Sequence, residues 1–183
     1  MLTPAAIESL FAREGSSLYG GEAISQAEHA LQCAWAAEQQ GDDDALVVAC
    51  LLHDLGHLLS AQRDDALARG IDDLHQHRVL PFLRPWLPAD VVEPIGLHVE
   101  AKRYLCAVDP DYEDALSDAS RHSLALQGGT MNPRQVAAFE SHRQAERAIR
   151  LRRHDDAAKV VGLATPPISH FLPRVAALLR VRA

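Results

Sequence analysis

Apolar positions recur along the chain at helical spacing, and helix-capping residues divide that pattern into segments. Thr3 can cap a first helix, with Pro4 at its first position and Gly15 beyond its end. Ser25 and Glu28 form a capping-box pattern that opens a second helix, which stops near the next glycine. No segment alternates steadily between apolar and polar residues, so the pattern predicts an all-α protein with little or no sheet.

The same start and stop signals place further helices along the rest of the chain. Aspartates supply the caps, and prolines and glycines mark the ends. The expected segments run from Ala45 to Leu59, from Asp72 or Asp73 to the prolines at 85 and 88, from Asp90 to Ala107, from Tyr112 to Leu126 before Gly128-Gly129, from Asn132 to Lys159, and from Ser169 onward as a short last helix.

The composition fits one globular helical domain. The chain has 183 residues, enough to bury a core without disulfide or metal staples, and we treat residues 1–183 as a single domain. Hydrophobic residues make up 48% and aromatic residues only 5%, a mix that favours helix interfaces. The formal charge of -7 argues against general binding to nucleic acid or to an anionic membrane, although a local basic pocket could still hold a small anion.

Cysteine usage and hydropathy predict a cytoplasmic protein. Cys33, Cys50 and Cys106 are odd in number, lack CxxC spacing and have apolar neighbours, which indicates free buried thiols in a reducing compartment. The N-terminus shows no basic segment followed by an apolar stretch, so no signal peptide is expected. The apolar run from Ala45 to Leu52 is too short to span a bilayer.

The strongest chemical signal is the motif His53-Asp54-Leu55-Gly56-His57 at the end of that apolar run. Imidazole and carboxylate both suit first-row metals, and a carboxylate can bridge two of them. Adjacent residues on a helix point about 100° apart, so His53 can serve one metal while Asp54 spans a pair. A bare His-Asp pair is more often only a polar helix end that meets solvent, so the rest of the chain has to decide.

Further candidate ligands stand in a fixed order along the chain. A histidine, a His-Asp pair, two later histidines and a late helical aspartate form the ligand order of the HD superfamily, which this chain resembles. The resemblance implies an HD-domain helical bundle. A single zinc needs only three or four ligands, so six ligands that share one bridging aspartate fit two metals better. The set is His29, His53, Asp54, His75, His98 and Asp155.

Other histidines compete for these places. His77 lies two residues from His75, and we prefer His75 because it follows the two aspartates of the helix start. His75-Gln76 departs mildly from the His-Glu that the superfamily usually has here. Four further histidines fit no motif and are interpreted as surface or hydrogen-bonded residues: His122, His142, His154 and His170.

Several longer motifs resemble one group within the superfamily, the PhnZ-type di-iron oxygenases. The resemblance covers roughly Tyr19 to Lys159, the core of the domain. The motifs are Tyr19-Gly-Gly-Glu22, Ser25-Gln-Ala-Glu-His-Ala-Leu-Gln32, Leu51-Leu-His-Asp-Leu-Gly-His57, His98-Val-Glu-Ala-Lys-Arg-Tyr-Leu105, Leu116-Ser-Asp-Ala-Ser120, Leu124-Ala-Leu-Gln-Gly-Gly129 and Asp155-Asp-Ala-Ala-Lys159.

The resemblance implies an O2-dependent enzyme with a mixed-valent Fe(II)/Fe(III) pair that cleaves the carbon–phosphorus bond of a 1-hydroxyphosphonate. The products are a carboxylic acid and phosphate, and a separate hydroxylase would supply the substrate. By position, the first iron would bind His29, His53, Asp54 and Asp155, and the second Asp54, His75 and His98. Tyr19 and Glu22 would lie on a mobile lid, and the phosphonate would contact His57, Lys102, Ser120, Gln127 and Arg152. Of these, Tyr19, Glu22, His57 and Lys102 would act closest to the reaction.

The charged residues support this interpretation independently. A buried phosphonate dianion needs positive charge and several hydrogen-bond donors. Lys102 lies one helical turn after His98, and Arg152 lies three residues before Asp155, so each can share a face with a metal ligand. Taken singly, Lys102 and Arg152 could equally be solvated surface charges.

Two other functions use the same residues. A metal-dependent phosphohydrolase would attack a small phosphate ester with metal-activated hydroxide, but it would not need the motif from Tyr19 to Glu22. A non-catalytic metal-binding or signalling module would leave the anion-binding set unexplained. We expect 2-amino-1-hydroxyethylphosphonate as substrate, with glycine as product, because Glu22 can bind a primary ammonium. A trimethylammonium group favours an aromatic cage, and Tyr19, Tyr104, Trp35 and Trp86 keep that alternative open.

Overall fold

The computed structural model describes residues 2–59 and 70–180, and within those ranges the regular structure is helical. The only pairing of extended segments there is an isolated bridge between Leu18 and Ser25. The predicted all-α class is therefore confirmed. The helices are α1 (Pro4–Glu14), α2 (Gln26–Gln39), α3 (Asp44–Leu52), α4 (Leu55–Leu58), α6 (His75–Arg78), α7 (Leu80–Leu83), α8 (Ala89–Val108), α9 (Tyr112–Ala115), α10 (Asp118–Leu126), α11 (Pro133–Glu140), α12 (Ala145–Ala157) and α13 (Ile168–Leu178).

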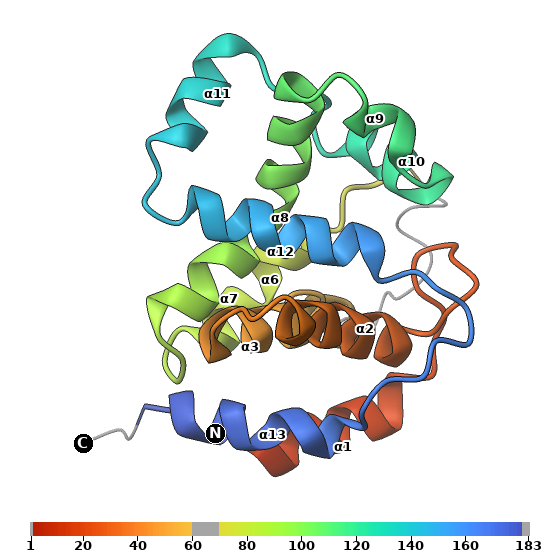
Figure 1. Cartoon of the computed structure of the whole chain (residues 1–183), viewed down its shortest axis with the longest axis vertical. Helices are drawn as coiled ribbons and strands as arrows, with labels where there is room; N and C mark the ends of the chain where they lie inside the picture. The colour runs from red at the N-terminus through yellow and green to blue at the C-terminus, as the bar shows by residue number, and fades with distance from the viewer. Residues whose placement is uncertain (1, 60–69, 181–183) are drawn as a thin grey trace.

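The helices stack in layers (Figure 1). The first and last, α1 and α13, lie side by side at one end, where α13 packs on α3 and α1 contacts α4. Helices α2 and α3 form the next layer, and α12 packs against both of them and against α8, which crosses behind it in Figure 1. Helices α9, α10 and α11 lie at the opposite end. Residues 46–52 of α3 are all buried, so this apolar helix forms the centre of the core.

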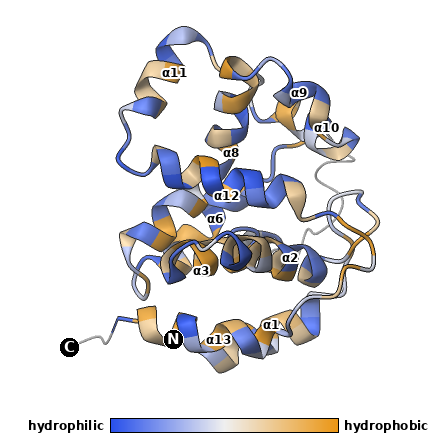
Figure 2. Cartoon of the chain, in the orientation of Figure 1, coloured by the Kyte–Doolittle hydropathy of each residue, from blue (hydrophilic) through white to orange (hydrophobic). Residues whose placement is uncertain are grey.

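Figure 2 shows that α12 is mostly hydrophilic, although it packs against four other helices, α2, α3, α8 and α11. Its buried residues include Arg152, His154 and Asp155. Burying a polar side chain costs free energy unless it forms hydrogen bonds or ion pairs. The buried polar residues of α12 therefore indicate a polar site in the interior of the molecule.

Several helix starts agree with the capping signals. The Thr3 hydroxyl accepts from the amide of Ala6 at 3.1 Å, and Ser25 and Glu28 form the reciprocal capping box. Cys33 and Cys50 are free and buried as predicted, whereas Cys106 is partly exposed, so the prediction of burial was wrong there. No helix in the described ranges combines the length and hydropathy needed to cross a membrane.

The predicted helix from Ala45 to Leu59 is divided into α3 and α4. The Nδ1 of His53 bonds the carbonyl oxygen of Cys50 at 2.8 Å, and Asp54 leaves helical geometry at φ -100° and ψ 11°. Such side-chain bonds to the backbone compete with continued helix. Helix α4 then packs so tightly on α6 that a Cβ at Gly56 would lie 2.3 Å from the carbonyl oxygen of His75.

Three other predicted helices are also interrupted. Pro81 has no amide hydrogen, and the predicted helix after Asp73 divides at Val79 into α6 and α7. The segment from Tyr112 to Leu126 breaks where Leu116 is extended and Ser117 caps α10. The long helix from Asn132 to Lys159 divides at residues 141–144 and ends at Ala157. Finally, α13 begins at Ile168, so Ser169 lies inside the helix and does not cap it.

Candidate metal centre and anion pocket

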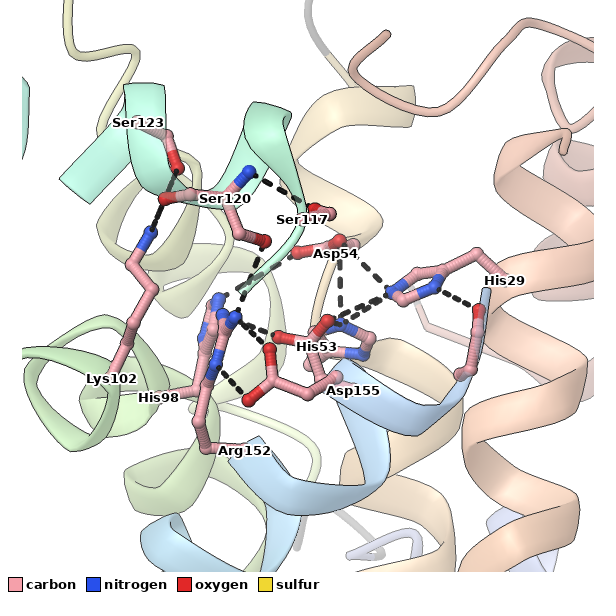
Figure 3. A network of polar contacts seen from close by, with 12 residues as sticks. His29, His53, Asp54, His98, Lys102, Ser117, Ser120, Ser123, Arg152 and Asp155 are labelled. Atoms are coloured by element: carbon pink, nitrogen blue, oxygen red, sulfur yellow. Dashed lines mark hydrogen bonds and ion pairs between the residues drawn. The ribbon is translucent and has the colours of Figure 1, made fainter. Parts of the chain in front are cut away.

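Two pairs of histidines meet at the centre of the bundle with their Nε2 atoms face to face. His29 of α2 and His53 at the end of α3 approach to 3.2 Å. His75 of α6 and His98 of α8 approach to 3.0 Å. All four side chains are buried, so four separate helices converge on one small volume (Figure 3 labels His29, His53 and His98).

The hydrogen bonds of the Nδ1 atoms determine whether the facing Nε2 atoms carry a hydrogen or a lone pair. Nδ1 of His29, His53 and His98 each lies 2.7–2.8 Å from a backbone carbonyl oxygen, of Ala158, Cys50 and Ile95 respectively. A carbonyl only accepts, so Nδ1 carries the hydrogen and Nε2 of the neutral ring carries a lone pair. Two facing lone pairs repel each other unless a cation lies between them, and this is how histidine ligands are oriented around metals.

Asp54 spans the two histidine pairs. Its Oδ2 lies 3.3 Å from Nε2 of His53 and 3.6 Å from that of His29, and its Oδ1 lies 3.3 Å from Nε2 of His75. Oδ1 is buried without a hydrogen-bond partner. Burial would raise the pKa of Asp54, but the neighbouring histidines hold it well below its usual value. An ionised carboxylate with an unpartnered buried oxygen fits a bridging ligand.

Asp155 completes the first group, with Oδ1 3.3 Å from Nε2 of His29. The described residues thus form two buried ligand groups whose donor atoms lie within 4.8 Å of one another: His29, His53 and Asp155, and Asp54, His75 and His98. These are the six residues predicted from the sequence. Their imidazole and carboxylate donors suit two first-row metal ions bridged by Asp54.

The structure distinguishes His75 from His77. His75 lies in the cluster, whereas His77 is exposed and belongs to neither group. The four other histidines also lie outside both groups. Among them, His154 is buried against Asp42 at 2.6 Å, His170 contacts Glu38 at 2.9 Å, and His122 is exposed at the edge of the cavity described next.

A cavity of about 540 Å³ opens over the metal-ligand groups. Both residues predicted to lie on a lid and all the residues predicted to bind the phosphonate line its wall. These are Tyr19, Glu22, His57, Lys102, Ser120, Gln127 and Arg152, beside Asp54, His75, His98 and Asp155. The residues named from the sequence therefore line one cavity, although some of them lie more than a hundred positions apart in the chain.

Lys102 and Arg152 are buried, and neither is a solvated surface charge. The Nζ of Lys102 donates to Ser123 Oγ at 2.8 Å, while burial, together with the nearby guanidinium of Arg152, lowers the pKa of Lys102 to about 7. Arg152 donates to Asp155 at 2.8 Å and to Tyr112 Oη at 3.1 Å, and it also pairs with Asp156. Figure 3 shows both cations pointing toward α10.

The loop from Tyr19 to Glu22 closes one side of the cavity. The Tyr19 ring stacks on His29 with centroids 3.8 Å apart, and its hydroxyl donates to Asp155 Oδ1 at 3.4 Å. Gly20 and Gly21 have positive φ values of 44° and 89°, which a side chain would strain. Ser117 Oγ donates to Glu22 at 2.5 Å and ties the loop to α10.

Sequence reasoning missed two residues of this site. Asp73 accepts from Nδ1 of His75 at 2.8 Å and from Nδ1 of His57 at 2.9 Å. Burial would lower the pKa of His57, but Asp73 and Asp54 raise it, which favours a cationic ring beside the cavity. The signal for Asp73 was its place two residues before His75. The second missed residue is Lys159, four residues after Asp155, which contacts Ser120 and Glu22.

Comparisons with known proteins identify the family. The chain is 40% identical over 169 residues to a 1-hydroxy-2-(trimethylamino)ethylphosphonate dioxygenase of Leisingera caerulea that forms glycine betaine, covering 92% of this chain and 86% of the relative. It is 41% identical over 166 residues to a hydroxymethylphosphonate dioxygenase of Gimesia maris, covering 90% of this chain and 82% of the relative. The chain belongs to this family of HD-type phosphonate dioxygenases. A 32% identical relative in Acanthamoeba polyphaga mimivirus, matched over 168 residues, is uncharacterised. No protein-family model matches the sequence.

As a phosphonate dioxygenase, this protein is an enzyme that cleaves carbon–phosphorus bonds with O2. The two buried His/Asp groups suit the dinuclear metal site of such an enzyme. The phosphohydrolase alternative would use the same ligands, but it does not account for the Tyr19–Glu22 loop that lines the cavity.

Proposed function

We propose that this dioxygenase cleaves the carbon–phosphorus bond of 2-amino-1-hydroxyethylphosphonate to glycine and phosphate, at an Fe(II)/Fe(III) pair held by the six ligands. The observation that carries the proposal is the position of Asp54 between two histidine pairs, below a cavity lined by cations. The ligand set would place the first iron on His29, His53, Asp54 and Asp155, and the second on Asp54, His75 and His98.

The reaction balances with one molecule of O2. Carbon 1 loses its bond to phosphorus and is oxidised to the carboxylate, and O2 is reduced, with one oxygen atom entering each product. When bound, the irons supply the electron and the coordination that activate O2. The hydroxyl on carbon 1 has to be introduced beforehand, so a separate hydroxylase would act on the parent phosphonate.

The protein's own groups bind and orient the substrate. Lys102 and Arg152 supply positive charge for the phosphonate dianion, and the hydroxyl of Ser120 and the amide of Gln127 supply further polar contacts. Holding the anion beside the ligand Asp155 brings carbon 1 close to the metals. The Tyr19–Glu22 loop covers the open side and restricts water there.

The cavity wall favours a primary ammonium on carbon 2. Glu22 and Asp72 offer carboxylates in the wall, whereas Tyr19 is the only Phe, Tyr or Trp among its described lining residues. Residues 60–69 contain none of these three residue types either. A trimethylammonium group is held best by several aromatic faces, while a primary ammonium needs hydrogen-bond acceptors such as carboxylates.

The test compares three phosphonates on anaerobically prepared enzyme, after metal analysis and EPR have established the iron pair. We expect kcat/KM to be highest for 2-amino-1-hydroxyethylphosphonate, with equimolar glycine and phosphate, and lower for its trimethylammonium analogue and for hydroxymethylphosphonate. Glu22→Gln should lower kcat/KM about tenfold for the amine and leave the value for hydroxymethylphosphonate nearly unchanged. Equal losses on both substrates would refute the role of Glu22, and a preference for either other phosphonate would refute the proposed substrate.

A further inference from the structure

The backbone around Lys159 is fixed on both sides by α2. The carbonyl oxygen of Ala158 accepts from Nδ1 of His29 at 2.8 Å. The side-chain amide of Gln32 donates to the carbonyl of Val160 at 2.8 Å and accepts from its backbone amide at 3.0 Å. Lys159 therefore lies in a stretch of backbone that hydrogen bonds hold to α2, and one of these bonds comes from His29 of the metal-ligand group.

The Lys159 ammonium helps to determine where the Ser120 hydroxyl proton points. Nζ donates to Ser120 Oγ at 2.8 Å, and Nη2 of Arg152 reaches the same oxygen at 3.5 Å. A serine hydroxyl has two lone pairs and one proton. Both lone pairs thus face cations, and the proton remains available to an acceptor in the cavity that Ser120 lines.

The same ammonium also contacts the loop over the cavity. It lies 3.8 Å from Glu22 Oε1 and 3.4 Å from Ser117 Oγ, and Ser117 itself donates to Glu22 at 2.5 Å. Ser117 in turn caps α10 by accepting from the amide of Ser120 at 3.2 Å. Lys159 therefore joins α10, the loop and the end of α12 at one point.

We propose that Lys159 is a positioning residue for substrate binding, which directs the Ser120 hydroxyl toward the anion and holds Glu22 at the cavity. Lys159 is not among the described residues that line the cavity, so it acts through Ser120 and Glu22. The identity of the anion as a phosphonate rests on the proposed function. Inorganic phosphate, the second product, presents the same tetrahedral oxygens and can serve as a probe without turnover.

A purely structural ion pair between Lys159 and Glu22 is the simpler alternative. The side chains are 12% and 19% exposed, and a pair 3.8 Å apart near the surface contributes little stability. Such a pair would affect anion binding, if at all, independently of Ser120. The two accounts therefore differ in whether the effects of Lys159 and Ser120 on affinity are coupled.

A double-mutant cycle measures that coupling through the Kd of inorganic phosphate for the metal-loaded enzyme under argon. Lys159→Met and Ser120→Ala should each weaken binding about tenfold, while the double variant should be within about twofold of Ser120→Ala alone. Lys159→Arg should keep most of the affinity. The matched control is Arg153→Met, whose side chain is 55% exposed and pairs with Asp109, and it should bind phosphate like the unmodified enzyme.

The proposal would be overturned if Lys159→Met weakened phosphate binding by the same factor in the unmodified enzyme and in Ser120→Ala. It would also be overturned if Lys159→Met alone left the affinity for phosphate unchanged. Hydrogen exchange of the backbone over residues 18–24 provides a second readout, because release of Glu22 should accelerate exchange there in Lys159→Met but not in Arg153→Met. Unchanged exchange would refute the contact with the loop. A different preferred substrate would refute the proposed function but leave the coupling for phosphate intact.

Discussion

Arg152 and Asp155 lie one turn apart on α12, and Nη1 of Arg152 donates to Oδ2 of Asp155 at 2.8 Å. The other oxygen of the same carboxylate faces Nε2 of His29 at 3.3 Å. One carboxylate therefore separates the guanidinium from the metal-binding histidines. In the proposed site, an anion held by Arg152 would lie next to the first metal position, which would couple substrate binding to the metal site.

Replacement of Arg152 by lysine tests this arrangement. Lysine retains the charge but offers one donor group where arginine offers a planar fork. Arg152→Lys should therefore raise KM for the phosphonate about tenfold or more, as steady-state kinetics would show. Arg153→Lys, on the exposed side of the same helix, is the matched control and should leave KM unchanged. An unaltered KM in Arg152→Lys would show that the guanidinium does not bind the substrate.

The pH dependence of binding should report Lys102. Its pKa of about 7 means that it is charged below neutral pH and loses its proton above it. The dianion needs the charged form, so affinity should fall as pH rises past about 7, by up to about tenfold per unit. Anaerobic titrations of hydroxymethylphosphonate with the unmodified enzyme and with Lys102→Met measure this, because their ratio cancels the ionisation of the ligand itself. A ratio that does not change with pH would contradict the assignment.

Metal content should distinguish the bridging aspartate from a nearby histidine. Asp54 contacts both histidine pairs, so Asp54→Ala should lose both metals when the purified protein is analysed. His77→Ala, at an exposed position two residues from His75, should keep both. Retention of two metals per chain by Asp54→Ala would show that Asp54 does not bridge, and metal loss in His77→Ala would show that the wrong histidine was chosen.

Tyr19 should give the resting enzyme a visible colour. Its ring lies on His29 and its hydroxyl reaches toward Asp155, so a small loop movement would bring the phenol oxygen to the first metal position. Coordination to a ferric ion would produce a charge-transfer band, which substrate should bleach. Tyr19→Phe should remove the band while both irons remain. Tyr104→Phe is the control, because the Tyr104 hydroxyl donates to Glu140 at 3.0 Å. This variant should keep the band. An unchanged spectrum in Tyr19→Phe would refute ligation by Tyr19.

The sequence predicted helix starts better than helix continuity. Capping at Thr3 and Ser25 depends on neighbouring residues, which the sequence displays directly. The break after His53 instead depends on a ring nitrogen that bonds a backbone carbonyl, and the break at Leu116 depends on a capping serine within an otherwise helical pattern. Both contacts are local, but histidine and serine also occur inside continuous helices, and tertiary packing decides between the two outcomes, so periodicity alone joined segments that the fold separates.

The residues of the two buried His/Asp groups could be named from the sequence because their residue types and order carry the chemistry. The preference for His75 over His77 agrees with the fold, in which the left-handed Leu74 precedes α6 and His75 is buried. Lys159 stands in the motif from Asp155 to Lys159, but its role was not predicted because its partners, Ser120 and Glu22, lie far from it in the sequence. No local pattern indicates a contact of that kind, which forms only when α10 and the loop meet the end of α12.

Oxygen isotope labelling tests the central claim most directly. The enzyme would be given 2-amino-1-hydroxyethylphosphonate under ¹⁸O2, and the products would be analysed by mass spectrometry, with a parallel reaction under argon. The account predicts one ¹⁸O atom in glycine, one in phosphate, and no more than a stoichiometric trace of products under argon. Phosphate released at the same rate without O2, with its new oxygen derived from water, would identify a hydrolase and contradict the account.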